Sequence, residues 1–257
     1  MKKLLFIFSA AIAFSACTTS TSTPPKDEKM YSWINSEHVA CGVPFDSDTS
    51  DDYIIVRDEY VLSYNAQRGA ANWIAWKLTS ASFGDVERYS GNFITDTSLP
   101  LPFRRIKHAD YTNSGYDRGH LVRSEERTYS QKANKATFLL TNIIPQTPDL
   151  NRGVWYDFEQ YCQELCTKQN KDLYIIAGGV YDRNVTTLKD EGKVEIPDSC
   201  YKIVYIVEHN QKPTASTVQS VSVIMPNIAG VRKYKYSTYI SSVPHIEQST
   251  GYSMPLR

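Results

Sequence analysis

Three short segments in the middle of the chain carry side chains suited to chemistry. They are Asp117–His120, Thr141–Gln146 and Leu150–Trp155, the last followed by Glu159. Hydrolysis of a phosphodiester needs a base that takes a proton from the attacking water, and histidine, with an ordinary pKa of about 6.5, suits this task near neutral pH. The negative charge that develops on the phosphate can be stabilised by a divalent cation and an arginine. The sequence therefore contains the side-chain types that phosphodiester hydrolysis requires.

Asn151 and Glu159 are the candidates for holding the cation. Magnesium keeps most of its water molecules and needs only one or two protein oxygens, so a single Asn carbonyl is sufficient as a direct ligand. A nearby carboxylate can hold the water molecules of the ion. On a regular helix Asn151 lies at the edge of the apolar stripe and Glu159 about 80° further round, on the flanking surface. Both side chains could then face a site beside the strand that carries His120.

The longest predicted helix contains Asn151. Apolar side chains recur at three- and four-residue spacing over Val154–Leu165, which is typical of one buried helical face. We expect this helix to span 151–168, with Asp149 as its N-cap. A shorter helix is expected over 243–250, with Gly251 as its C-cap.

Segments rich in Ile, Val, Tyr and Phe are predicted to be strands. They span 53–57, 60–64, 73–78, 137–143, 173–177, 202–207 and 218–225. The strands and helices do not alternate regularly, which favours an α+β fold. No second linker and no internal repeat follow Cys41, so residues 41–257 are expected to form a single domain.

The motifs resemble those of the DNA/RNA non-specific endonucleases, a family of the ββα-metal class that includes Serratia-type nucleases and mitochondrial endonuclease G. The segments that carry the resemblance are Tyr116–His120, Thr141–Pro148 and Leu150–Trp155. Further matches extend it to roughly residues 40–255; they are Tyr60–Asn65, Asn72–Leu78, Leu173–Gly178, Val194–Pro197 and Thr250–Gly251. The resemblance implies a ββα-metal nuclease fold with a mixed or antiparallel sheet core and helices packed on it.

Carried over by position, the resemblance implies a role for each matching residue. His120 is expected to be the general base. Asn151 is expected to be the single direct protein ligand of Mg²⁺, with Mn²⁺ as an alternative ion, and Glu159 to hold the water molecules of the metal. The implied activity is hydrolysis of DNA and RNA by a one-metal mechanism, without sequence preference.

The resemblance also assigns supporting roles. Arg118 is expected to contact the phosphate and stabilise the transition state, and Arg88, in a looser match, to be a second phosphate-contacting arginine. Asn142 is expected to support the site geometry, including the orientation of His120, whereas Asp117 is interpreted as structural. The other histidines lack such a context and are also interpreted as structural; they are His38, His108, His209 and His245.

The start of the chain is predicted to be an export signal. Lys2 and Lys3 precede an apolar run, Leu4–Phe14, which is too short to span a membrane as a helix. The ending Phe-Ser-Ala-Cys resembles a bacterial lipobox, so we expect residues 1–16 to be a signal peptide and Cys17 to carry the lipid of an exported lipoprotein, anchored to a membrane in the cell envelope or at the cell surface. The alternative is a plain secretory signal that is cut nearby. Residues 17–40 are expected to be this lipidated cysteine and a flexible tether.

The remaining cysteines leave several states open. They are Cys41, Cys162, Cys166 and Cys200. One or two disulfides are compatible with export, and the sequence does not choose among the pairings. A zinc site is the weaker interpretation, because Cys162 and Cys166 have no histidine nearby. Buried or bridged thiols are favoured.

Overall charge does not reveal a nucleic-acid partner, since 28 Lys and Arg balance 28 Asp and Glu. Basic residues outnumber acidic ones over 104–135, which would attract a phosphate backbone of any sequence or form an ordinary solvated face. Two other functions stay open. One is a nucleic-acid-binding surface lipoprotein that keeps the nuclease fold with little turnover; the other is an envelope phosphodiesterase for a small substrate.

The intact set of His120, Arg118, Asn151 and Glu159 favours the enzyme, because a pure binding protein would not need it. The resemblance implies DNA and RNA as substrates, and the sequence does not reveal which of the two is preferred. It indicates no protein partner and leaves open whether the chain forms a homodimer.

Overall fold

The computed structural model describes residue 31 and residues 34–181, 184–189 and 192–256. The predicted signal peptide and Cys17 lie outside the described residues. Residues Trp33–Arg257 form one compact unit. Within the described segments, no helix is both long enough and apolar enough to cross a membrane.

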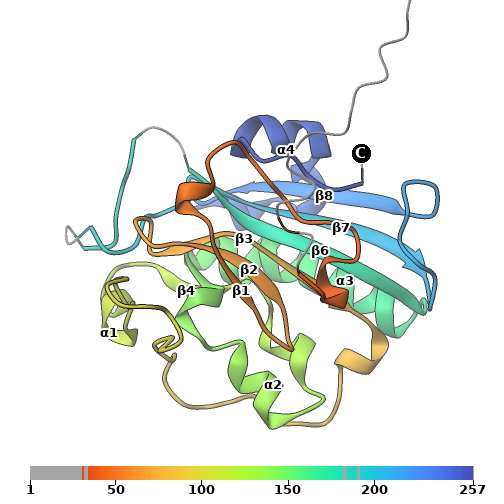
Figure 1. Ribbon diagram of the computed structural model, residues 1–257, viewed down its shortest axis with the longest axis horizontal. Helices are drawn as coiled ribbons and strands as arrows, with labels where there is room; N and C mark the ends of the chain where they lie inside the picture. The colour runs from red at the N-terminus through yellow and green to blue at the C-terminus, as the bar shows by residue number, and fades with distance from the viewer. Residues whose placement is uncertain (1–30, 32–33, 182–183, 190–191, 257) are drawn as a thin grey trace, which may run out of the picture. The chain divides into compact units, whose positions relative to one another are not determined.

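A seven-stranded sheet forms the centre of this unit (Figure 1). Its order is β1-β2-β3-β6-β7-β8-β9, and each neighbouring pair is antiparallel. The strands are β1 (Tyr53–Val56), β2 (Val61–Asn65), β3 (Ala70–Leu78), β6 (Lys171–Val180), β7 (Ser199–Glu208), β8 (Gln219–Pro226) and β9 (Ile240–Ser241). All the predicted strands except 137–143 are confirmed by these elements.

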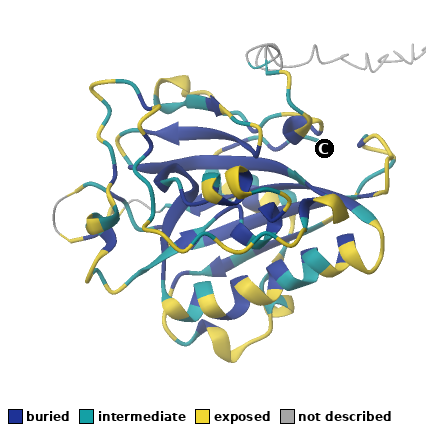
Figure 2. Cartoon of the chain, turned by 90° about the horizontal axis from the view of Figure 1, so that it is seen from below, coloured by how far each residue is buried: buried dark blue, intermediate teal, exposed yellow. Residues whose placement is uncertain are grey.

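Both faces of the sheet are covered by apolar side chains. Along β3, Ile74 and Trp76 pack toward α3 (Trp155–Thr167), whereas Trp73 and Ala75 pack toward α4 (Val243–Thr250). This alternation follows from the two-residue repeat of a strand. Figure 2 shows the central strands buried and the outer surfaces of the helices exposed. The predicted helix over 243–250 is confirmed, and Gly251 ends it in the left-handed region at φ 80°.

A second, two-stranded sheet lies on the α3 side. It pairs β4 (Asp117–His120) with β5 (Ile143–Gln146), and α3 follows β5 in the chain. This is a ββα arrangement in an α+β fold, as predicted. The predicted strand over 137–143 is wrong: Leu140–Asn142 is a turn of 3-10 helix, η6, and only Ile143 enters β5. Short helices fill the connections; they are α1 (His108–Tyr111), α2 (Gln131–Ala136), η2 (Glu37–Val39), η3 (Thr49–Asp51), η4 (Ser80–Ser82) and η5 (Ser124–Arg127).

The predicted helix over 151–168 is confirmed only in part. Its regular portion, α3, starts at Trp155 and ends at Thr167, and it is preceded by the π-helical turn η7 (Leu150–Val154). Gly153 breaks the helical geometry with φ −121° and ψ −115°. Asp149 is itself helical and makes no capping bond; its carboxylate accepts from the backbone N–H of Gly230 instead. The predicted N-cap is therefore wrong.

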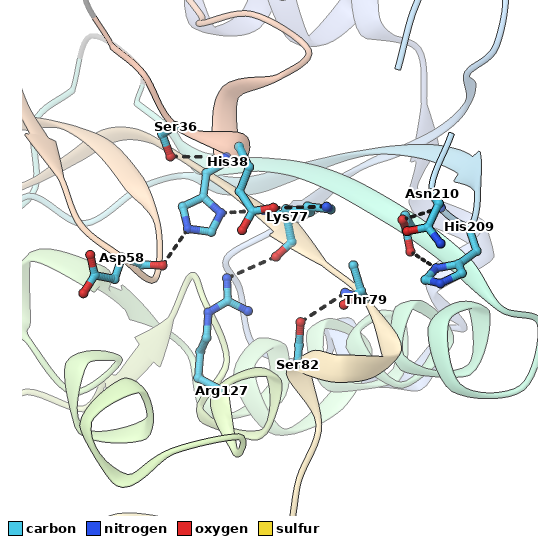
Figure 3. A network of polar contacts seen from close by, with 11 residues as sticks. Ser36, His38, Asp58, Lys77, Thr79, Ser82, Arg127, His209 and Asn210 are labelled. Carbon is cyan, nitrogen blue, oxygen red and sulfur yellow. Dashed lines mark hydrogen bonds and ion pairs between the residues drawn. The ribbon is translucent and has the colours of Figure 1, made fainter. Parts of the chain in front are cut away.

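Buried polar contacts attach the N-terminal part of the unit to the sheet (Figure 3). The ring of His38 lies 2.9 Å from the carbonyl oxygen of Asp58, and its other nitrogen accepts from the backbone N–H of Lys77. The buried guanidinium of Arg127 donates to the carbonyl of Lys77. Burial lowers the pKa of His38. These contacts fit the structural interpretation of His38.

The four cysteines of the described chain are buried free thiols. Of the two states that the sequence left open, buried thiols and disulfides, these four cysteines have the first. Burial raises the pKa of the Cys41 and Cys200 thiols to about 12, so these groups remain protonated. They behave as small apolar groups in the core.

Candidate active site

A pocket of about 450 Å³ opens where β4, η7, the start of α3 and the segment that follows β3 meet. Five of the six predicted site residues line it, namely His120, Arg118, Arg88, Asn151 and Glu159. Asn142 does not line it. The other lining residues are Phe93, Asp117, Arg123, Ser124, Glu125, Arg152 and Tyr156.

His120, at the end of β4, is held by aromatic rings. The ring centroids of Phe93 and Phe138 lie 5.2 and 5.0 Å from that of the imidazole. Its Nε2 atom is buried and has no hydrogen-bond partner among the described residues. The pKa of His120 is lowered to about 3. Burial is the larger cause, and the positive charges of Arg88 and Arg123 act in the same direction. The imidazole is therefore neutral near neutral pH and able to accept a proton.

The glycine before His120 allows β4 to lie close to β5. A Cβ atom on Gly119 would lie 2.1 Å from Oε1 of the buried Gln146. Any side chain at this position would have to displace Gln146, because such a distance is far inside a van der Waals contact. The glycine of the Asp-Arg-Gly-His motif is therefore required by packing.

Asn151 is oriented by Asp117. The amide nitrogen of Asn151 donates a 2.9 Å hydrogen bond to Oδ2 of Asp117. Asp117 also accepts two hydrogen bonds from Arg152, at 2.7 and 2.6 Å. Because the nitrogen faces Asp117, the side-chain oxygen of Asn151 remains available to an ion in the pocket. Asp117, interpreted from sequence as structural, thus contacts the predicted metal ligand directly.

Glu159 lies in the wall of the pocket and not on a flanking surface, so that part of the prediction is wrong. It is 5% exposed. Its carboxylate lies 3.4 Å from Nζ of Lys202 and 3.7 Å from Nε of Arg123. The expected 80° separation assumed a regular helix from Asn151 onward, but the π turn and the break at Gly153 change the angular relation of the two side chains.

Lys202 of β7 is a partner of Glu159 that sequence reasoning missed. The side chain is 1% exposed, and Nζ lies 4.3 and 5.4 Å from the ring centroids of Trp155 and Trp76. Burial raises the pKa of Glu159, and the charge of Lys202 acts in the opposite direction. The lysine lies in an Ile- and Val-rich strand, where the sequence gives no indication that its side chain contacts a carboxylate of α3.

The two predicted phosphate-binding arginines are held by polar and aromatic contacts. Nη2 of Arg118 donates to the carbonyl of His108 and to the hydroxyl of Thr112. Nε of Arg88 donates to the hydroxyl of Ser124, and its guanidinium carbon lies 4.8 Å from the ring centroid of Phe138. Arg88 is thereby fixed where its charge acts on His120, and Arg118 is fixed in the same pocket, with its guanidinium carbon 5.7 Å from the ring centroid of Phe93.

Arg123 is a third cation in the pocket. It donates to Oε1 of Gln160 at 2.7 Å, and its guanidinium carbon lies 5.0 Å from the ring centroid of Tyr156. The sequence placed Arg123 only within a basic stretch, with no motif around it to indicate a role.

Asn142 supports the segment after His120 and has no hydrogen bond to the imidazole. It is fully buried. Its amide nitrogen donates to the carbonyls of Val122 and Thr137, and its oxygen accepts from the backbone N–H of Val122. Asn142 therefore fixes the backbone between η6 and the residues following β4.

The oxygens at this site suit a hydrated, hard cation. They are the amide oxygen of Asn151 and the carboxylate of Glu159, and carboxylates and carbonyls are ligands that magnesium and manganese prefer. In the part of the chain that the structure describes, no three His, Cys, Asp or Glu side chains are grouped as a metal cage. The donor set fits an ion that keeps most of its water molecules.

Comparison with known proteins identifies the fold and the motifs together. Residues 39–255 match the model of the DNA/RNA non-specific endonuclease family. A nuclease from Nostoc sp. is 40% identical over 208 residues, which cover 79% of this chain and 73% of that protein. Human mitochondrial endonuclease G is 27% identical over 205 residues, covering 76% of this chain and 67% of that protein. A crystal structure of an EndoG/EndoGI complex superposes with a TM-score of 0.71 at 26% identity, covering 84% of this chain and 89% of that one.

The fold and pocket are those of a ββα-metal nuclease. The chain belongs to the DNA/RNA non-specific endonuclease family. Members of this family use a divalent metal ion. The relatives reported above are nucleases, so they give no support to a binding protein without turnover.

Proposed function

We propose that this protein is a magnesium-dependent endonuclease that hydrolyses DNA and RNA without sequence preference. The observation that carries the proposal is the convergence of His120, Asn151, Glu159 and two arginines on one pocket. Family membership supports the class of reaction. Magnesium fits the oxygen donors, and manganese is an alternative ion with the same ligand preference.

In the proposed mechanism, neutral His120 removes a proton from the water that attacks phosphorus. Its lowered pKa keeps the ring neutral at neutral pH, so the lone pair of its unprotonated nitrogen is free before water attacks. Arg118 and Arg88 lie beside the phosphate and stabilise the charge that builds up on its oxygens. Asn151 would hold the metal ion directly and Glu159 would hold its water molecules, and the bound ion would supply further stabilisation of negative charge.

Asp117 and Lys202 act on these residues without touching substrate. Asp117 holds the nitrogen of the Asn151 amide and so turns its oxygen toward the pocket. Lys202 places its Nζ 3.4 Å from the Glu159 carboxylate inside the protein. Both are positioning residues in this proposal.

The experiment that tests this proposal is nicking of supercoiled plasmid and cleavage of a structured RNA by the purified protein. Magnesium, manganese and chelator arms are compared, with His120→Ala as the inactive control. Cleavage of both polymers with magnesium, and its loss in chelator and in the variant, is expected. DNA and RNA that both stay intact with magnesium present would show that the proposal is wrong.

We further propose that the protein is exported and anchored to a membrane through lipid on Cys17. The support is the basic start, the apolar run and the lipobox-like ending of residues 1–17. Metabolic labelling with a fatty-acid probe is expected to mark the wild-type protein and not Cys17→Ser. Equal labelling of both would contradict the anchor.

A further inference from the structure

The segment after β8 is attached firmly to the elements that carry the active site. The side-chain oxygen of Asn227 accepts from the backbone N–H of Thr147 at 2.7 Å, and its nitrogen donates to the carbonyl of Pro145 at 3.0 Å. The N–H of Gly230 donates to Oδ2 of Asp149 at 2.6 Å. These bonds fix the position of residues 227–230 relative to β5 and η7.

Arg232, two residues after Gly230, contacts residues at the edge of the pocket. Nη1 of Arg232 lies 3.6 Å from Oδ1 of Asp149, and Nη2 donates to the backbone carbonyl of Arg152 at 3.4 Å. Arg152 itself lines the pocket. A Cβ atom on Gly153 would lie 2.7 Å from Cβ of Arg232, so the two segments are in close contact.

Beyond this contact lie four consecutive exposed residues, Arg232, Lys233, Tyr234 and Lys235, which we call the basic loop. The Arg232 side chain is 52% exposed and Tyr234 is 59% exposed. Neither lysine forms an ion pair with an acid in the described parts of the chain. Three basic side chains and one exposed ring therefore lie on four consecutive residues, the first of which pairs with Asp149 and contacts the pocket-lining Arg152.

The far side of the basic loop is anchored to α3. The Tyr236 ring packs on those of Phe158 and Tyr161, with centroids 5.3 and 5.5 Å apart. The hydroxyl of Tyr239 donates to the carbonyl of Val231. These contacts lie in η8 (Val231–Lys233) and η9 (Tyr236–Tyr239), on either side of Tyr234. The loop is thus held at both ends, and its exposed side chains are presented on a supported backbone.

We propose that the basic loop is a second nucleic-acid-binding surface, on which a single-stranded part of the substrate lies beside the active site. This inference rests on the proposed function. Phosphates would contact Arg232, Lys233 and Lys235, and an unpaired base would stack on Tyr234. Proteins that bind single strands without reading sequence use two components: cationic side chains that contact the phosphates and aromatic rings on which the bases stack. A duplex would conceal the base faces that Tyr234 needs.

The proposal is tested by binding in chelator, where no cleavage occurs. Fluorescence anisotropy with a labelled oligothymidine is measured for the wild-type protein, Tyr234→Ala and Tyr234→Trp. Loss of one stacked base is expected to weaken binding about 5- to 100-fold in Tyr234→Ala. Tyr234→Trp is expected to bind as tightly as the wild-type protein, because an aromatic face is retained.

The phosphate contacts are tested by salt dependence. For Lys233→Ala/Lys235→Ala, the slope of log affinity against log salt is expected to flatten by about 1.4, since each phosphate contact on a single strand contributes about 0.7. The matched control is Lys212→Ala. Lys212 is exposed and lies in the β7–β8 connection, at the end of these two strands that is opposite to Pro226. Its slope is expected to equal that of the wild-type protein.

Two results would overturn the assignment. One is oligothymidine binding by Tyr234→Ala that equals wild-type binding. The other is an equal loss of affinity for a duplex of the same length, since stacking on Tyr234 needs an unpaired base. Cleavage of bis(nitrophenyl) phosphate is expected to be the same in all loop variants. Absence of any cleavage by the wild-type protein would contradict the proposed function and leave the binding result intact.

Discussion

Substitution of Asp117 gives the sharpest test of how Asn151, the proposed metal ligand, is positioned. In Asp117→Ala, the amide of Asn151 loses the carboxylate that holds its nitrogen at 2.9 Å. The amide can then rotate, and its oxygen no longer faces the pocket in every molecule. We expect the magnesium concentration for half-maximal cleavage to rise.

The size of the effect follows from the kind of bond that is lost. A hydrogen bond to a charged group contributes about 1.5–3 kcal/mol, and about 1.4 kcal/mol corresponds to a factor of ten. The half-saturating magnesium concentration should therefore rise about 10- to 100-fold, which is also the range found when partners of metal ligands are removed. Saturating magnesium should restore most of the rate, because His120 is unchanged.

The assay is the initial rate of plasmid nicking across a magnesium titration, with Arg152→Ala as the matched control. Arg152 is the other partner of Asp117, and its side chain is 66% exposed. An exposed pair contributes only about 0–1 kcal/mol, so this control should shift the titration by less than about 5-fold. Thermal unfolding of both variants checks the fold. A titration midpoint for Asp117→Ala that equals the wild-type midpoint would refute the positioning role.

Three further outcomes are expected. His120→Ala should lower the nicking rate at least about 100-fold, because a general base is lost, and should leave the half-saturating magnesium concentration unchanged. A near-normal nicking rate would show that His120 is not the general base. Burial lowers the folded-state pKa of His120 to about 3, below its unfolded value of about 6.5, so the unfolded chain binds more protons between these two pH values and the free energy of unfolding should fall as the pH drops from about 6.5 to about 3. In urea unfolding, His120→Gln should show a weaker fall than the wild-type protein. The same pH dependence in both proteins would contradict the burial argument. Lys202→Met should lower the free energy of unfolding by about 3–5 kcal/mol, because it leaves the Glu159 carboxylate buried without its partner at 3.4 Å. In urea unfolding, the double variant Lys202→Met/Glu159→Gln should recover part of that loss. No recovery would contradict a stabilising interaction between Lys202 and Glu159.

The central sheet could be predicted because its strands are long and rich in β-branched and aromatic residues. β6 and β7 pair over ten residues each, and nearly all their positions are buried, so local composition and tertiary packing favour the same structure. Residues 137–143 have a similar composition, but most of them are not in a strand. There Asn142 bonds to backbone groups of Val122 and Thr137, and this tertiary contact stabilises a 3-10 turn.

Motif residues predicted five of the side chains that line the pocket, but they did not predict Arg123, the Lys202 partner of Glu159 or the geometry of the site. A helical projection from sequence assumes one regular helix, and the π turn at Leu150–Val154 violates that assumption. Asp117 lies within a motif, yet only the folded chain brings its carboxylate to Asn151, 34 positions later. Lys202 is 43 residues from Glu159, and no local pattern reports a contact across that separation.

Gly153 has a consequence for redesign of this nuclease. The Cβ atom of Arg232 fills the space beside the α-carbon of Gly153, and Arg232 also donates to the carbonyl of Arg152. The turn that carries Asn151 and the segment after Gly230 are therefore packed tightly together. A foreign sequence in that segment whose backbone does not fit against Gly153 would displace the turn that carries Asn151, the proposed metal ligand. A redesign meant to change which nucleic acids this segment binds must therefore keep Asn227, Gly230 and the backbone conformation at position 232. It can vary only the side chains that follow.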